Sequence, residues 1–140
     1  IEVPDSGARG VIATMGGAPA GWSLYLDAEG RPVFTYRAFE AGEIELAGNA
    51  ALGAGRHVVQ GAFNYGGGGY AQGATVRLQI DGAATREGRL AVTPPKFFSI
   101  NETFDVGVDM GSAAGRYPEE TGPGYAFRGG RIERVDLQLR

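Results

Sequence analysis

Three acidic residues within eight positions are the chain's best candidate ligands for a metal ion. Glu102, Asp105 and Asp109 stand in a segment that also contains Gly107 and Gly111. Carboxylate and backbone carbonyl oxygens of such loops are the ligands that calcium prefers. Asp105 and Asp109 are therefore predicted as a candidate calcium site, and no cofactor is required otherwise. The alternative is a turn in which these aspartates accept hydrogen bonds from backbone amides.

Aromatic rings in loops are candidates for stacking on sugar faces. Tyr70 and Tyr117 lie outside the strands predicted below and are the candidate carbohydrate ligands. Trp22 and Tyr25 fall within a predicted strand, where aromatic rings more often pack in the core or across strands. A lectin-like function therefore depends on the two loop tyrosines.

The single histidine, His57, lacks the sequence context of a catalytic base. A Ser–His–Asp triad needs a serine within hydrogen-bond reach of the histidine, and none of the four serines stands in a nucleophile-elbow sequence. The chain has no cysteine, which excludes thiol nucleophiles, disulfides and cysteine-based metal sites. His57 is predicted to lie in a turn or at a strand edge.

Two acidic pairs raise glycoside hydrolysis as a further alternative. Such enzymes place two carboxylates on either side of a groove. Glu43 and Glu45 share one face of a short predicted strand, and Glu119 and Glu120 are neighbours in a long loop. Neither arrangement predicts two carboxylates facing each other, so a glycosidase is the least favoured function.

The elements that must position these residues are short β-strands. Apolar and polar residues alternate with the period of a half-buried strand, and glycine or proline breaks separate the strands. About nine strands, each with one apolar face, predict an all-β fold of two packed antiparallel sheets, with jelly-roll topology preferred. The predicted strands cover residues 10–15, 22–27, 32–39, 43–47, 57–65, 76–81, 86–92, 97–100 and 134–139.

Composition supports one soluble domain and argues against two classes of partner. A length of 140 residues favours a single domain, 1–140. The net charge is −3 without a basic cluster, so no nucleic acid is expected. No apolar run approaches the roughly 20 residues of a membrane-spanning helix, so no membrane partner is expected. Because it begins at Ile1 within an already patterned sequence, the chain is predicted to be a piece of a longer protein.

Several segments together resemble the C-terminal region of long bacterial arylsulfatases. The resemblance runs in order and at similar spacing over nearly all of the chain. The segments are GWSLYL at 21–26, GRPVFTY at 30–36, FNYGGG at 63–68, GATV at 73–76 leading to IDG at 80–82, ETFDVGVDMGS at 102–112, and the closing stretch 127–139.

This resemblance implies an accessory role. In those enzymes an N-terminal domain resembling alkaline phosphatase hydrolyses the sulfate ester, with a formylglycine made from the Cys or Ser of a C/S-x-P-x-R motif. The present chain contains no such motif, so no catalytic residue carries over. The resemblance implies a non-catalytic, concanavalin-A-like β-sandwich that packs on the catalytic domain of the same chain and helps to shape substrate access. It also implies a soluble bacterial protein, periplasmic or secreted.

Overall fold

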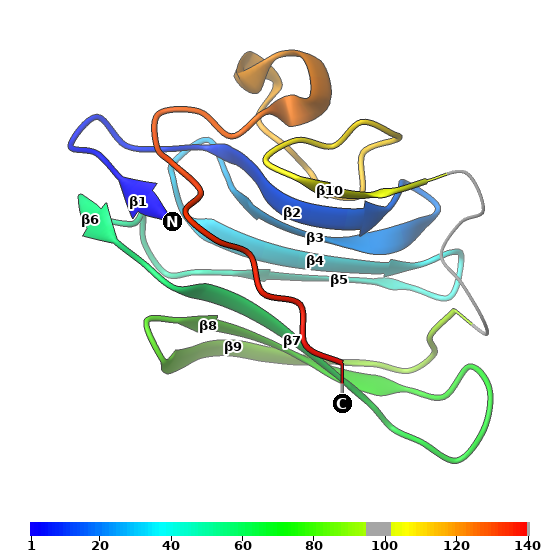
Figure 1. Cartoon of the computed structure of the whole chain (residues 1–140). Helices are drawn as coiled ribbons and strands as arrows, with labels where there is room; N and C mark the ends of the chain where they lie inside the picture. Colours follow the sequence, from blue (N-terminus) through cyan, green and yellow to red (C-terminus); the bar gives the residue numbers. More distant parts are fainter. Residues whose placement is uncertain (95–101, 140) are drawn as a thin grey trace.

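The computed structural model describes residues 1–94 and 102–139 (Figure 1). Ten β-strands and two short 3₁₀ helices make up its regular structure, and no α-helix occurs among the described residues. The all-β prediction is therefore confirmed. The elements are β1 (Glu2–Val3), β2 (Gly10–Gly16), β3 (Ala20–Leu26), β4 (Pro32–Ala38), β5 (Glu43–Ala47), β6 (Gly55–Arg56), β7 (Val59–Tyr65), β8 (Ala74–Ile80), β9 (Ala83–Leu90), β10 (Phe104–Val106), η1 (Glu119–Thr121) and η2 (Pro123–Tyr125).

The strands form two main antiparallel sheets and one small sheet. A five-stranded sheet has the order β10-β2-β3-β4-β5, and a three-stranded sheet has the order β7-β8-β9. Strands β1 and β6 pair separately. Figure 1 shows the five-stranded sheet lying over the three-stranded one, with β5 packing against β9 and β4 against β8. The predicted β-sandwich is thus confirmed.

The main core lies between the two sheets. Alternate residues of β8, Val76 and Leu78, are fully buried, because strand side chains point to opposite faces in turn. They belong to one apolar cluster with Leu24, Leu26 and Phe34 of the five-stranded sheet. The alternation read in residues 22–27 and 76–81 therefore identifies the inward faces of β3 and β8 correctly.

The outer face of the five-stranded sheet is also buried, beneath the segment 107–126. Val11, Tyr25 and Val33 on this face form a second apolar cluster with Tyr117. Antiparallel sheets commonly leave one face to solvent, but here the chain folds back over it. In Figure 1 this covering segment, 107–126, is the yellow-to-orange stretch beyond β2.

Two sequence predictions about strands are wrong. Residues 134–139 form no strand, although their residues alternate, and Leu137 and Leu139 are 59% and 90% exposed. Alternation describes an amphipathic segment, but a strand also needs a neighbouring edge to bond with, and the last bridge is Arg131 to Glu2. Conversely, β10 forms outside all of the predicted strands. The strand predicted at 97–100 lies outside the described residues.

Candidate functional site

Asp109 is the buried centre of the covering segment. The residue is only 2% exposed. Its Oδ1 accepts a hydrogen bond from the Gly111 N–H at 3.2 Å, and its Oδ2 accepts from the Ala114 N–H at 3.1 Å and the Tyr117 hydroxyl at 2.7 Å. A buried carboxylate is tolerated only when such donors surround it. Asp109 therefore fixes the turn that carries Tyr117.

Tyr117 is hydrogen-bonded and packed on all sides by the fold. Its hydroxyl also lies 2.9 Å from Ser23 Oγ on the sheet below. Burial raises the pKa of Tyr117 well above that of free tyrosine, which keeps the hydroxyl protonated as a donor to Asp109. The ring of Tyr117 lies between those of Tyr25 and Tyr125, and its centroid is 5.1 Å from the first and 4.8 Å from the second. At 8% exposure, Tyr117 presents no free face to a sugar.

The other acidic residues of this stretch also cap their own loop. Asp105 accepts hydrogen bonds from the Thr103 hydroxyl at 3.0 Å and the Met110 N–H at 3.1 Å. Glu102 accepts one from the Ser112 hydroxyl at 2.7 Å. In residues 1–94 and 102–139, no group of three histidine or acidic side chains is placed to hold a metal ion. Calcium binding by Asp105 and Asp109 stays a prediction, which a thermal melt in excess calcium against chelator tests.

Tyr70, the other predicted sugar ligand, lies in the turn between β7 and β8. Its side chain is exposed, at 76%, and the turn is held by hydrogen bonds from the Tyr65 hydroxyl to the Gly69 carbonyl and from the Gln72 N–H to the Tyr65 hydroxyl. Tyr70 belongs to the three-stranded sheet and Tyr117 to the cover of the five-stranded one. The structure therefore does not bring the two tyrosines into one site.

His57 lies at the end of the sandwich between two hydrogen-bond acceptors. Its Nδ1 is 2.8 Å from Asp81 Oδ2, and its Nε2 is 2.9 Å from the Gly53 carbonyl oxygen. The hydrogen bond to Asp81 raises the pKa of His57. Both ring nitrogens are engaged in these contacts, so neither is available to activate a serine. This position matches the predicted turn or edge histidine.

Three of the four carboxylates in the two acidic pairs lie near arginines. Arg116 of the covering segment lies 3.4 Å from Glu43 and 4.0 Å from Glu45 on β5. Glu120 lies 3.3 Å from Arg9. These carboxylates tie surface segments together by ion pairs, an arrangement unlike the opposed acid and base of a glycosidase.

An exposed apolar edge is the feature that sequence patterns missed. Among the residues that the structure describes, the five-stranded sheet has two more strands than its partner, so β7 reaches only part of the way across. Phe63 of β7 stacks on Tyr36 with centroids 4.6 Å apart, but Met15 and Phe104 beyond it are 40% and 41% exposed. Pairing places side chains in one row across the sheet: Phe104, Met15, Trp22, Tyr36 and Ile44.

We call Met15, Trp22, Phe63 and Phe104 the apolar edge. Trp22 joins this edge to the core. The centroid of its ring lies 6.0 Å from that of Phe104 in the edge and 6.3 Å from that of Phe34 in the core. The alternation of Phe104 and Val106 is the sequence signal for β10. Sequence alone gives no signal that the opposite sheet stops short of these side chains.

Comparison with known proteins adds no relative to this description. Neither protein-family models, nor curated proteins, nor solved structures gave a match to the chain. None of the helices in the described residues is long and apolar enough to cross a bilayer.

Proposed function

We propose that the chain is a non-catalytic accessory β-sandwich of an arylsulfatase-type hydrolase and packs on the catalytic domain through the apolar edge. The observation that carries this proposal is the row of Met15 and Phe104, which are 40% and 41% exposed, beside Trp22. Aromatic residues and methionine are enriched in protein interfaces, and domains of one chain pack through surfaces of moderate size. A neighbouring domain seated on the edge would supply the cover that the short sheet leaves out.

The segments that resemble arylsulfatases all serve the architecture. Residues 21–26 and 30–36 form most of β3 and β4, and 63–82 form β8 with its two turns. Residues 102–112 supply β10 and the hydrogen bonds of Glu102, Asp105 and Asp109. A shared scaffold, concanavalin-A-like in type, accounts for such a resemblance better than a shared reactive centre.

The state of the chain's reactive groups supports a non-catalytic role. The imidazole of His57 and the carboxylate of Asp109 are engaged in internal contacts. Catalytic groups need a free position from which to meet a substrate. The role left to the domain is to pack, and through packing to shape access to the hydrolytic site.

The catalytic half of the proposal is tested by an aryl sulfate assay on the isolated chain. We expect no turnover at any protein concentration, and activity that survives removal of contaminants would overturn the proposal. The reading frame upstream of Ile1 provides a second test. A C/S-x-P-x-R motif a few hundred residues earlier is expected, and a frame without it contradicts membership of an arylsulfatase.

The packing half is tested by titrating the chain with the separately produced upstream domain. We expect a complex that the double variant M15S/F104S weakens at least about tenfold, since each substitution removes buried apolar area. The matched control is Met110→Ser, which alters an exposed methionine of the covering segment on the other side of the sheet. Equal weakening by both variants, or no complex with the wild type, would contradict the proposed edge.

Carbohydrate binding is the alternative function, and the exposed ring of Tyr70 is the observation that favours it. A glycan array followed by calorimetry tests it directly. Loss of binding in Tyr70→Ala, with retention in Tyr125→Ala, would support a lectin-like module.

A further inference from the structure

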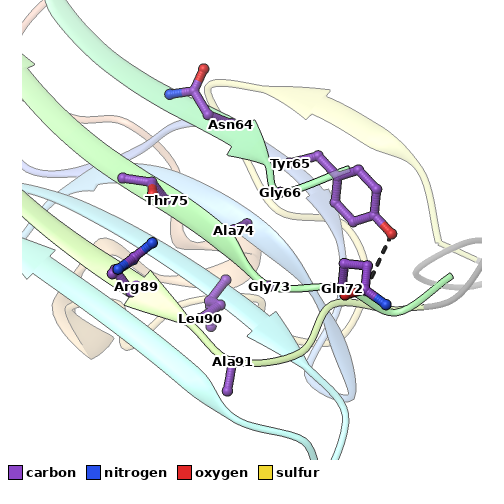
Figure 2. A pocket seen from close by; sticks show the side chains of 10 residues that line it. All are labelled: Asn64, Tyr65, Gly66, Gln72, Gly73, Ala74, Thr75, Arg89, Leu90 and Ala91. Atoms are coloured by element: carbon purple, nitrogen blue, oxygen red, sulfur yellow. Dashed lines mark hydrogen bonds between the residues drawn. The ribbon is translucent and has the colours of Figure 1, made fainter. Parts of the chain in front are cut away.

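An open cavity of about 600 Å³ lies at the end of the three-stranded sheet (Figure 2). It lies beside the β7–β8 turn and is lined by the ends of β7, β8 and β9. The volume falls within the range typical of small-molecule sites. The cavity is distinct from the apolar edge, and it contains none of the residues of the covering segment.

One wall of the cavity is a polar row across the three strands. Asn64 of β7 pairs with Thr75 of β8, and Thr75 pairs with Arg89 of β9. Directly paired residues point to the same face of a sheet, with β-carbons about 5 Å apart. An amide, a hydroxyl and a guanidinium therefore stand side by side, as Figure 2 shows.

Next to this row, residues with little or no side chain leave the cavity open. The Gly66 N–H donates to the Gly73 carbonyl at 2.8 Å, which continues the β7–β8 ladder beyond the strand ends. A β-carbon on Gly66 would lie 2.7 Å from the Gly73 oxygen, and one on Gly73 would lie 2.6 Å from the Leu90 oxygen. The close backbone approach therefore requires glycine at both positions, and Ala91 adds only a methyl group.

Arg89 differs from the other arginines of its sheet. Arg77 is paired with Glu87, and Arg86 is hydrogen-bonded to Asn49. Arg89 makes no side-chain hydrogen bond or ion pair with any residue in 1–94 or 102–139. Its guanidinium thus has five N–H donors free for a ligand.

The rim of the cavity offers a further polar group. Gln72 donates from its side-chain amide to the Tyr70 carbonyl at 3.3 Å, and its backbone N–H donates to the Tyr65 hydroxyl at 3.2 Å. These bonds hold the amide of Gln72 beside the opening, where its carbonyl oxygen can accept a hydrogen bond.

We propose that this cavity binds an anionic saccharide. The free guanidinium of Arg89 matches the two oxygens of a carboxylate or sulfate group in a bidentate pair. Asn64, Thr75 and Gln72 supply both donors and acceptors, which hydroxyl groups of a sugar ring need. The chain as a whole carries a net charge of −3. Arg89, and not the overall charge of the chain, therefore attracts an anion to the cavity.

The proposal is tested by calorimetric titration of the folded chain with three probes. These are a neutral oligosaccharide, a uronate oligosaccharide and a sulfated oligosaccharide of similar length. We expect binding of at least one anionic probe and at least about tenfold weaker binding of the neutral one, because hydrogen bonds to a charged group are stronger than those between neutral groups. The difference between the two anionic probes identifies the group that Arg89 binds.

Two arginine variants separate a specific site from general charge attraction. Arg89→Gln is expected to weaken binding of the anionic probe at least about tenfold, whereas Arg86→Gln on the same strand is expected to leave it unchanged. Thermal melts establish that both variants are folded. Equal weakening by the two variants, equal binding of the neutral probe, or no binding of either anionic probe overturns the proposal. None of these outcomes bears on packing at the apolar edge, so the two proposals can fail separately.

Discussion

His57 lies between two groups that can only accept hydrogen bonds, the Asp81 carboxylate and the Gly53 carbonyl. A neutral imidazole donates from one nitrogen only, so only the imidazolium satisfies both partners. The hydrogen bond to Asp81 raises the pKa of His57, and the same bond lowers the pKa of Asp81. The carboxylate also accepts from the Val58 N–H at 2.8 Å. The histidine therefore ties the start of β7 to the β8–β9 turn.

The pair makes stability depend on pH in a defined direction. Because the pKa of His57 is raised, its contribution is complete below the ordinary value of 6.5 and is lost as pH rises through the raised pKa. Because the pKa of Asp81 is lowered, its contribution is present above the ordinary value of 3.8 and is lost as pH falls through the lowered pKa. The pair therefore stabilises the fold most between these two values.

We expect His57→Gln to lower the free energy of unfolding by up to about 1 kcal/mol near pH 5, since Asp81 is half-exposed. The difference from wild type should shrink as pH rises through the raised pKa of His57. Urea unfolding at about pH 5 and at a series of higher pH values measures it. A difference in the free energy of unfolding that stays constant across this pH range would show that the imidazolium does not contribute.

The covering segment, 107–126, explains why β2, β3 and β4 are buried on both faces. Three polar side chains on the outer face, Thr14, Ser23 and Thr35, are fully buried beneath it. Tyr117 brings a hydroxyl to Ser23 from above, and Asp109 holds that hydroxyl in place. A stretch with little regular structure thus acts as a third layer, and one buried carboxylate organises it.

Tyr117→Phe tests this element. The change leaves the ring in place but removes a donor from buried Asp109, so we expect a loss of about 1–3 kcal/mol in the free energy of unfolding. Tyr125→Phe is the matched control, because the Tyr125 hydroxyl makes no hydrogen bond among the described residues. It should change stability by less than about 0.5 kcal/mol. Similar losses in the two variants would mean that the hydroxyl of Tyr117 is not a structural anchor.

At the scale of the whole molecule, β7 of the three-stranded sheet crosses close over the Phe34 ring of the five-stranded one. A β-carbon added to Gly61 would lie 2.8 Å from that ring. The contact helps to set how near the three-stranded sheet can lie, and among the described residues that sheet ends beyond it, beside the apolar edge. The spacing and the unequal widths of the sheets therefore determine the surface offered to a partner.

Gly61→Ala is expected to lower the free energy of unfolding by about 1–3 kcal/mol, because an added methyl group overpacks the contact with Phe34. Gly53→Ala is the control: its added β-carbon meets nothing within 4 Å, so little change is expected. Chemical unfolding of both variants provides the measurement. A neutral Gly61→Ala would indicate that the sheets have room to separate.

Local patterns were sufficient for most strands. Alternation in Trp22, Leu24 and Leu26, and again in Val76 and Leu78, predicted the faces that are buried. Asp81-Gly82 is a typical sequence for a hairpin turn, and β8 and β9 are joined by one there, with φ values of 52° and 80° at the two residues. Both signals depend on neighbours in sequence, either the two-residue period of a strand or the backbone freedom of a tight turn.

The sequence by itself therefore determined an all-β sandwich, its inward faces and the turns that join its strands. Only the tertiary structure decided that Asp109 meets Tyr117, that residues 134–139 remain unpaired, that Arg89 lacks an acidic partner in the described residues, and that Met15 and Phe104 are 40% and 41% exposed. Each of these outcomes depends on which distant segment arrives beside a residue. Local periodicity records which side of a strand is apolar, but it carries no information about the width of the sheet that packs against it.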